Sequence, residues 1–211
     1  MIELFGSALV TFLVIIDPPG CAPIFASLTR GATNAERRAM AIRSSIIAWA
    51  ILMFFALLGR PMLDALGIGL GSFRIAGGIL LFYIAVEMVF ERRTEPRENR
   101  AQSIEGTPEA DDISVFPMAI PMIAGPGSIA SAMLWVSRAH TPTHVAIVLA
   151  AITVVILLTM ITLLAAGRLM RLIGPKIEAM ITRILGVILA ALAAQFVVDG
   201  LIESFPTLAQ P

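Results

Sequence analysis

The sequence predicts an all-α integral membrane protein with six transmembrane helices, arranged as two inverted three-helix repeats whose helices 1 and 4 are broken near the midplane. Three observations lead to this fold class. First, 58% of the 211 residues are hydrophobic, only 14% are charged, and the mean hydropathy is +0.90. This composition is typical of membrane proteins. Second, apolar stretches of nearly spanning length recur along the chain. Third, proline and glycine interrupt two of them.

Each of the six apolar stretches approaches the about 20 residues that a helix needs to cross a bilayer. They cover roughly residues 4–28, 42–59, 70–90, 113–137, 145–167 and 181–198. The third stretch contains Arg74, but a charge near a helix end can snorkel to the interface. The N-terminus lacks the basic region and cleavage site of a signal peptide. We therefore expect the first helix to stay in the mature protein.

The distribution of Lys and Arg predicts the orientation, because loops on the cytoplasmic side carry an excess of these residues. With the N-terminus outside, the inner loops hold every basic residue except Arg60, Arg74 and Arg138. Both termini are therefore expected outside. The predicted organisation is a first three-helix repeat (1–90), a charged cytoplasmic linker (91–112) that we expect to be solvated and mobile, and a second, inverted repeat (113–211).

Ordered matches between the two halves indicate the repeat. They pair Pro19-Gly20 with Pro126-Gly127 at an offset of 107, Thr33 with Thr141 at 108, Gly59-Arg60 with Gly167-Arg168 at 108, and the segments that start at Arg74 and Arg183 at 109. Thr33 opens the capping-box sequence TNAE and Thr141 precedes Pro142, so each stands where the N-cap of a helix is expected. An odd number of spans in each half forces the second half to enter the membrane from the opposite side. Inverted repeats of this kind are typical of secondary transporters.

Two helix breaks at corresponding positions of the repeats form the candidate binding site. The first comprises Asp17, Pro18, Pro19, Gly20 and Cys21, and the second comprises Gly125, Pro126, Gly127 and Ser128. Proline removes a backbone donor and glycine tolerates most dihedral angles, so each helix is expected to be discontinuous there. Irregular backbone at membrane depth is tolerated where protein buries it or where it lines a watery cavity. Each break should expose the free N–H groups of a half-helix, which suit an anionic substrate group.

Asp17 has two compatible interpretations. It can be the N-cap of the second half-helix, with Pro18 at the first helical position. It can also be a proton or cation site, because an ionisable group at this depth is costly and usually functional. Asp17 is thus the candidate for the coupling ion, and its counterpart in the second half, Ala124, carries no charge.

These residues resemble a known family. The pattern formed by Asp17, Pro18, Gly20, Pro23 and Phe25, together with Gly125-Pro126-Gly127, is similar to that of the MarC family of bacterial inner-membrane proteins. Many members have Asn where this chain has Cys21. The resemblance covers nearly the whole chain and implies a multi-pass inner-membrane transporter of small neutral amino acids such as glycine or alanine, with proton coupling left open. In a bacterial inner membrane, the outer side on which the charge distribution predicts both termini is the periplasm.

Other function classes stay open at this stage. A membrane-embedded serine protease needs Ser128 beside a buried histidine, and an aspartyl protease needs a second aspartate at depth. We therefore expect no enzyme. A non-transporting scaffold remains the main alternative, although a scaffold gains nothing from paired breaks. The two histidines, His140 and His144, do not by themselves make a zinc site. No cofactor, metal or nucleic acid is expected, and the predicted partners are a small-molecule substrate and the lipid bilayer.

Overall fold

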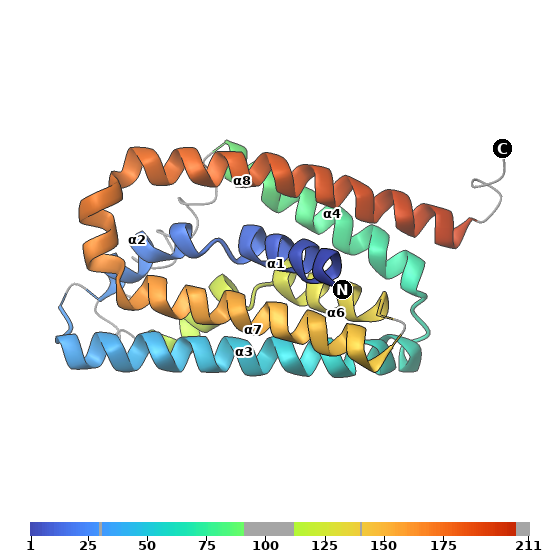
Figure 1. Ribbon diagram of the computed structural model, residues 1–211, viewed down its shortest axis with the longest axis horizontal. Coiled ribbons are helices and arrows are strands. Elements are labelled where there is room, and N and C mark those ends of the chain that lie inside the picture. The colour runs from blue at the N-terminus through green and yellow to red at the C-terminus, as the bar shows by residue number, and fades with distance from the viewer. Residues whose placement is uncertain (30, 91–111, 140, 206–211) are drawn as a thin grey trace.

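The computed structural model describes residues 1–29, 31–90, 112–139 and 141–205, and every regular element in this part of the chain is a helix (Figure 1). The elements are α1 (Ile2–Ile16), α2 (Pro18–Leu28), α3 (Asn34–Ala65), α4 (Leu70–Val89), η2 (Ser114–Ile123), α6 (Pro126–Ser137), α7 (Pro142–Leu164) and α8 (Ala166–Ser204). Residues 91–111 of the predicted linker lie outside the described residues.

The predicted all-helical, multi-span class is confirmed. In the described residues, five helical stretches are long and apolar enough to cross a membrane, with α1 and α2 together forming the first of them. The helices η2 and α6 form a further stretch that is bent by 55° and would be the sixth span. The helix η2 is not a regular α-helix, because Phe116 and Ile120 have extended backbone angles within it.

The caps predicted for two of the spans are present. Thr33 accepts a hydrogen bond from the N–H of Glu36, and the Glu36 carboxylate accepts from Thr33 in return, which forms a complete capping box. Thr141 accepts a hydrogen bond from the N–H of His144 at 3.2 Å and precedes Pro142, the first residue of α7. Both caps fix the start of a long helix at the residue that the sequence predicts.

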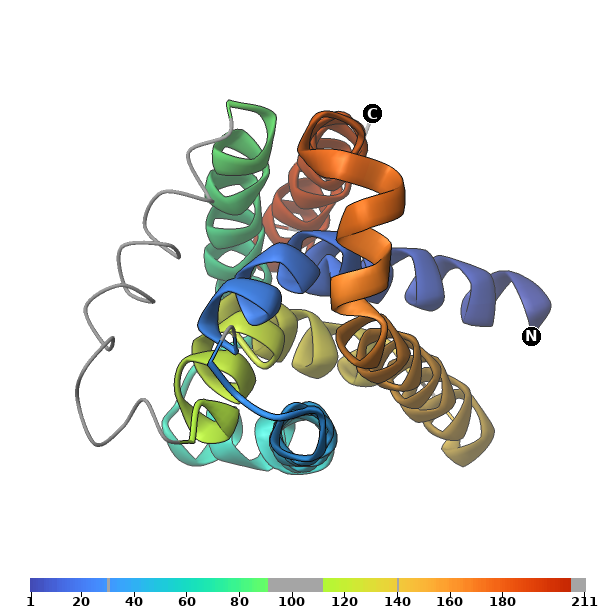
Figure 2. The ribbon, with the colours of Figure 1, turned by 90° about the vertical axis from the view of Figure 1, so that its left-hand side faces the viewer.

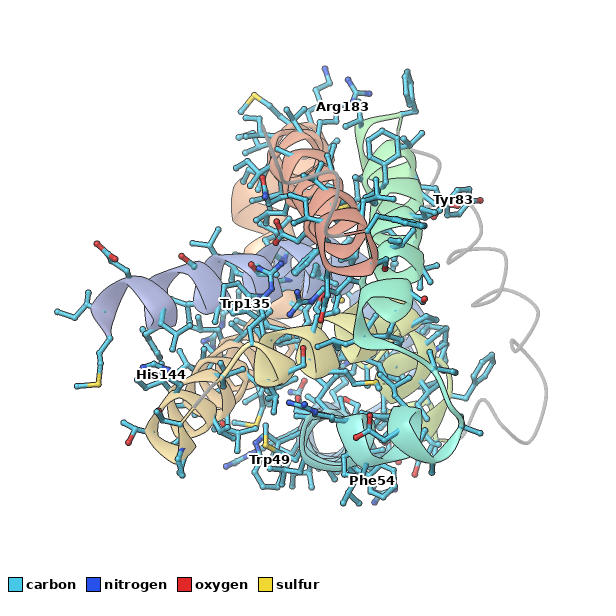
Figure 3. All side chains as sticks on the ribbon, turned by 90° about the vertical axis from the view of Figure 1, so that its right-hand side faces the viewer. Trp49, Phe54, Tyr83, Trp135, His144 and Arg183 are labelled. Atoms are coloured by element: carbon cyan, nitrogen blue, oxygen red, sulfur yellow. The ribbon has the colours of Figure 1, made fainter. Side chains whose placement is uncertain are left out.

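The first span lies in the middle of the bundle. In its most apolar window 72% of the residues are buried, against 28% to 39% for the windows of α3, α4, α7 and α8. Figure 2 shows α1 and α2 between the α4–α8 pair and the α3–α7 pair. Large apolar and aromatic side chains such as Phe54 and Tyr83 point outward from the surrounding helices (Figure 3). Side chains that face the hydrocarbon core of a bilayer need to be apolar, and the outer surface of these helices meets that requirement.

Helices α4 and α8 lie against each other through glycine. A Cβ atom added at Gly78 would lie 2.8 Å from the backbone oxygen of Ala193, and one added at Gly200 would lie 2.8 Å from the backbone oxygen of Gly71. Small residues allow the backbones of two membrane helices to approach this closely. At one end of these two helices, Arg74 of α4 forms an ion pair with Glu203 of α8, with 2.8 Å between Nη1 and Oε2.

Helix α8 begins with a segment that runs across the end of the bundle before the long transmembrane part starts (Figure 2). The change of direction occurs at Gly174, whose φ of 71° lies in the region that favours glycine. The span itself runs from Ala179 to Ser204. The end of the bundle at which α7 and α8 meet is also the end at which α2 finishes and α3 starts (Figure 1).

Candidate functional site

The first break is centred on Asp17, which ends α1 and begins α2. Its φ of 54° and ψ of 66° are left-handed, a conformation in which Asp and Asn are enriched among residues other than glycine. Its side chain accepts a hydrogen bond from the N–H of Gly20 at 3.2 Å, as an N-cap does. Asp17 is only 1% exposed. The predicted capping role of this carboxylate is therefore confirmed.

Gly20 allows this cap to form. A Cβ atom added at Gly20 would lie 2.2 Å from Oδ2 of Asp17, so any larger residue would displace the carboxylate. The thiol of Cys21 lies 3.4 Å from the carbonyl oxygen of Ile16 and donates to it across the break. The buried backbone of the first break is thus held by two side chains from within the motif, Asp17 and Cys21.

The expectation of free N–H groups at the start of α2 is wrong. Pro18 and Pro19 have no N–H, the N–H of Gly20 donates to Asp17, and the N–H of Cys21 donates to the carbonyl oxygen of Asp17 at 3.0 Å. Every donor of the first turn is therefore absent or already bonded. The N-terminus of α2 offers no backbone N–H to an anion.

The second break is bridged by Ser128. Its hydroxyl donates to the carbonyl oxygen of Ile123 at 2.7 Å and accepts from the N–H of Gly125 at 3.2 Å. Ser128 is 2% exposed. One hydroxyl thus satisfies an acceptor before the break, the carbonyl oxygen of Ile123, and a donor after it, the N–H of Gly125, which keeps irregular backbone stable in the interior.

The start of α6 differs from the start of α2. Pro126 has no N–H, and the first N–H that bonds back to the preceding turn is that of Ile129, which donates to Gly125 at 3.0 Å. The N–H groups of Gly127 and Ser128 therefore precede the hydrogen-bonded turns, and no side chain caps them. Of the two half-helices, only α6 offers free N–H groups and the positive end of its dipole.

The two breaks approach each other. A Cβ atom added at Gly127 would lie 3.5 Å from Cγ2 of Ile15, so the last turn of α1 contacts the first turn of α6. Figures 1 and 2 agree in showing both breaks in the middle of the bundle. The carboxylate of Asp17, two residues after Ile15, and the free N–H groups of α6 consequently belong to one region of the interior.

Burial of the predicted site residues is uneven. The structure buries Asp17, Pro18, Gly20, Cys21, Gly125, Gly127 and Ser128, leaves Pro19 half-buried, and exposes Pro126. The exposed ring of Pro126 marks the side on which the second break reaches the surface. The other predicted residues lie inside the protein, where a substrate would be shielded from lipid.

Two further polar residues of α6 were not predicted from the sequence. The hydroxyl of Ser131 and the Nε1–H of Trp135 are buried, and neither has a hydrogen-bond partner among the described residues. Met133 of the same helix faces Gly59 of α3, so Ser131 and Trp135 lie on the opposite face. Trp135 is 8% exposed and lies in the interior of the bundle (Figure 3). A lone serine and a lone tryptophan in an apolar helix give no sequence signal, which is why they were missed.

In the part of the chain that the structure describes, no group of three or more His, Cys, Asp or Glu residues could hold a metal ion. His140 lies outside the described residues, and His144 follows the cap of α7. The chemistry available at the breaks is therefore that of one carboxylate, backbone N–H groups, and the hydroxyl and indole donors of α6.

Fold and site together define a multi-pass α-helical membrane protein with broken helices at its centre. A family model described as MarC family integral membrane protein matches residues 2–205. The chain belongs to the MarC family.

Curated relatives match the chain over nearly its whole length. It is 36% identical over 200 residues to the UPF0056 membrane protein MJ1677 of Methanocaldococcus jannaschii, which covers 95% of this chain and 97% of that protein. It is 34% identical to the UPF0056 membrane protein YvbG of Bacillus subtilis, over 94% of each chain. It is 31% identical to the UPF0056 inner membrane protein YhgN of Escherichia coli, over 92% of this chain and 94% of that protein. No solved structure shows significant similarity to the chain.

Proposed function

We propose that this protein is a secondary transporter of small neutral amino acids or similar small polar solutes, which binds its substrate between the two broken helices. The observation that carries the proposal is the contact between Ile15 and Gly127, which brings a buried carboxylate and an uncapped helix N-terminus into one region. Broken helices that meet inside a membrane bundle are typical of substrate sites in transporters.

An inverted repeat is part of the proposal, and the helix contacts support it. In such a repeat α1 corresponds to η2, α2 to α6, α3 to α7, and α4 to α8. When each helix is replaced by its counterpart in the other half, each contacting pair becomes another contacting pair. The pair α1–α7 becomes η2–α3, the pair α2–α8 becomes α6–α4, and the pair α2–α7 becomes α6–α3. The α3–α7 and α4–α8 pairs map onto themselves. This exchange is the pattern expected of two halves related by a pseudo-two-fold axis.

Hydrogen bonds at the two breaks support the same repeat. Cys21 donates to the carbonyl oxygen of Ile16, and Ser128 donates to the carbonyl oxygen of Ile123. The two donors, Cys21 and Ser128, are 107 residues apart in the sequence, and so are the two acceptors. The same offset relates Gly20 to Gly127. Different side chains thus bridge corresponding carbonyl groups. Asp17 has no such counterpart, so the charge belongs to one half only.

The chemistry of the site suits a zwitterion. The carboxylate of an amino acid can accept from the N–H groups of Gly127 and Ser128 at the positive end of α6. Its ammonium group is complementary to the carboxylate of Asp17. Protonation of that carboxylate would weaken the second contact, which provides a route for coupling transport to protons. Cys21 and the backbone of Pro18 and Pro19 form the other wall of the site.

We infer that the chain is not an enzyme. Ser128 would be the nucleophile of a serine hydrolase, but its hydroxyl bonds to the backbone at Ile123 and Gly125. A nucleophilic serine instead needs an adjacent base. A purely structural scaffold would have no reason to bury two polar breaks in contact.

Orientation in the bacterial inner membrane is also proposed, with both termini in the periplasm and residues 91–112 in the cytoplasm. Alkaline phosphatase requires the periplasm to fold, so a fusion after Pro211 should be active and a fusion after Gln102 inactive. The opposite pattern of activity would reverse the orientation.

Transport itself is tested with purified protein in liposomes. Labelled glycine and alanine should accumulate when a proton gradient is imposed, and a protonophore should abolish the accumulation. Ser137→Ala is the matched control for serine substitutions at the second break. Its side chain lies at the far end of α6 and bonds to the carbonyl oxygen of Leu134, so this variant should transport like the wild type. Folded wild-type protein that moves no small amino acid in either direction, under any gradient, would overturn the proposal.

A further inference from the structure

Helix α6 has two buried hydrogen-bond donors to which the transport function proposed above assigns no contact. The Oγ of Ser131 and the Nε1 of Trp135 have no hydrogen-bond partner among the described residues. Ser131 is 0% exposed and Trp135 is 8% exposed. Buried polar groups are nearly always hydrogen-bonded, and each one that is not destabilises the folded protein. Two such donors on one helix therefore need a reason other than packing.

The two donors lie on one face of α6. They are four residues apart, so they are neighbours on the helix surface, about one turn from each other. Two other faces of α6 are used for packing, because Met133 contacts α3 and Leu134 contacts α4. Helices α1 and α7 also contact α6. Ser131 and Trp135 thus face the side of α6 on which α1 and α7 pack.

Both side chains lean toward the second break. In an α-helix the Cα–Cβ bond is tilted toward the N-terminus, so a side chain covers the turn before its own residue. Ser131 therefore covers the turn that begins at Gly127, and Trp135 covers the turn that contains Ser131. A row of donors results. It begins at the uncapped N–H groups of Gly127 and Ser128 and continues through the hydroxyl and the indole.

The fold does not require polar side chains at these two positions. In the proposed repeat, with its offset of 107 residues at the breaks, Ser131 corresponds to Ile24 of α2. Trp135 corresponds to Leu28, the last residue of α2. Ile24 is buried and Leu28 is half-buried. Apolar side chains thus fill the corresponding places in the other half. The two donors occur only on the half-helix that also has free N–H groups, which associates them with its ligand.

We propose that Ser131 and Trp135 form a second station for the carboxylate of the substrate, further along α6 from its N-terminus. The station presupposes the transport function proposed above, because it lies beside the same break. An indole N–H is a donor only, so it suits an acceptor and not an ammonium group. A carboxylate has two oxygens that can accept from both donors, and hydrogen bonds to an ionised acceptor are stronger than neutral ones. The substrate class is therefore that of solutes with a carboxylate.

Tryptophan fluorescence tests the station without transport. The chain has two tryptophans, so the full-length variant Trp49→Phe keeps only Trp135. Trp49 is 40% exposed on α3 and its Nε1–H donates to Thr153 of α7, away from α6 (Figure 3). Indole emission responds to hydrogen bonding at the N–H. Purified Trp49→Phe in detergent is titrated at neutral pH with alanine and with alaninamide, which keeps the ammonium group but has no carboxylate. Trp135→Phe is the control.

Alanine should change the emission of Trp135 in a saturable way, and alaninamide should require at least about tenfold higher concentrations. Trp135→Phe should show no response. Adding Ser131→Ala to Trp49→Phe should raise the alanine concentration at half-saturation by about tenfold. This variant should fold, because the hydroxyl that it loses has no partner. Adding Ser137→Ala instead should change nothing, since its hydroxyl bonds to Leu134 on another face of α6.

The outcomes separate the second station from transport itself. If the wild type accumulates alanine in liposomes but the emission of Trp135 does not respond, or responds equally to alaninamide, the station is wrong and the transport function stands. Equal titrations for Ser131→Ala and Ser137→Ala would lead to the same conclusion. If alanine is neither transported nor able to change the emission, both proposals are wrong.

Discussion

Ser131 and Trp135 lie one turn apart on α6, and the Oγ of Ser131 and the Nε1 of Trp135 are both buried without a hydrogen-bond partner among the described residues. A buried donor that lacks a partner destabilises the folded state by about 1–3 kcal/mol. Removing the hydroxyl of Ser131 should therefore leave the free energy of unfolding unchanged or raise it by about 1 kcal/mol. If the hydroxyl meets substrate or water during transport, Ser131→Ala should at the same time lower the apparent affinity for glycine.

Ser128→Ala gives the contrast within the same helix. It removes the bond to the carbonyl oxygen of Ile123 and leaves the N–H of Gly125 unpaired. The free energy of unfolding should fall by about 1–3 kcal/mol. Chemical denaturation in detergent compares the two variants. A Ser131→Ala protein that is as destabilised as Ser128→Ala would mean that the Ser131 hydroxyl has a stabilising partner.

The contact between α4 and α8 leads to a packing prediction. A methyl group at position 78 would meet the backbone oxygen of Ala193 at 2.8 Å, and a backbone atom cannot rotate away. Gly78→Ala should therefore lower the free energy of unfolding by about 1–3 kcal/mol. Gly6→Ala is the control, since a Cβ there has nothing within 4 Å. Alanine in a helix interior should stabilise α1 by up to about 1 kcal/mol relative to glycine. Equal unfolding midpoints for the two variants would contradict the close approach.

Arg138 joins the end of α6 to α8. Its guanidinium pairs with Asp199 and lies 4.7 Å from the ring centroid of Phe196. Burial lowers the pKa of Arg138, while the charge of Asp199 opposes that shift. Asp199→Asn leaves this half-buried cation without its counter-charge, so the free energy of unfolding should fall by about 1–3 kcal/mol.

The double variant Arg138→Gln/Asp199→Asn tests whether the two residues act as a pair. It should be destabilised less than the sum of the two single variants, because neither charge is then left alone. Strict additivity in a thermal or chemical unfolding series would show that the pair contributes nothing beyond its separate residues.

The sequence predicts much of this architecture because a bilayer requires helices of a known apolar length. Apolar length identifies the spans, and the caps at Thr33 and Thr141 follow from local hydrogen bonding. The asymmetry of the breaks could not be predicted in the same way. It depends on whether particular N–H groups find acceptors. The N–H of Gly20 donates to the side chain of Asp17, whereas no side chain caps the N–H of Gly127. The unpartnered Ser131 was missed because only tertiary packing decides which hydroxyls are buried.

Asp17 combines a structural role with the proposed coupling role, and substitutions can separate them. Asparagine tolerates left-handed backbone and caps a helix about as well as aspartate, but it does not titrate. Asp17→Asn should therefore unfold like the wild type. Alanine loses the cap and strains the backbone at a φ of 54°, so Asp17→Ala should be destabilised by about 2 kcal/mol. Glutamate keeps the carboxylate but is too long for the same cap.

In proteoliposomes, Asp17→Asn should exchange labelled alanine but lose accumulation driven by a proton gradient. Asp17→Glu should retain part of the pH response and be less stable than the wild type, because it keeps the charge and loses the cap geometry. If Asp17→Asn accumulates alanine at the wild-type rate with an undiminished response to the gradient, Asp17 is only a cap. The coupling residue would then be another carboxylate, with Glu87, half-buried on α4, the next to substitute.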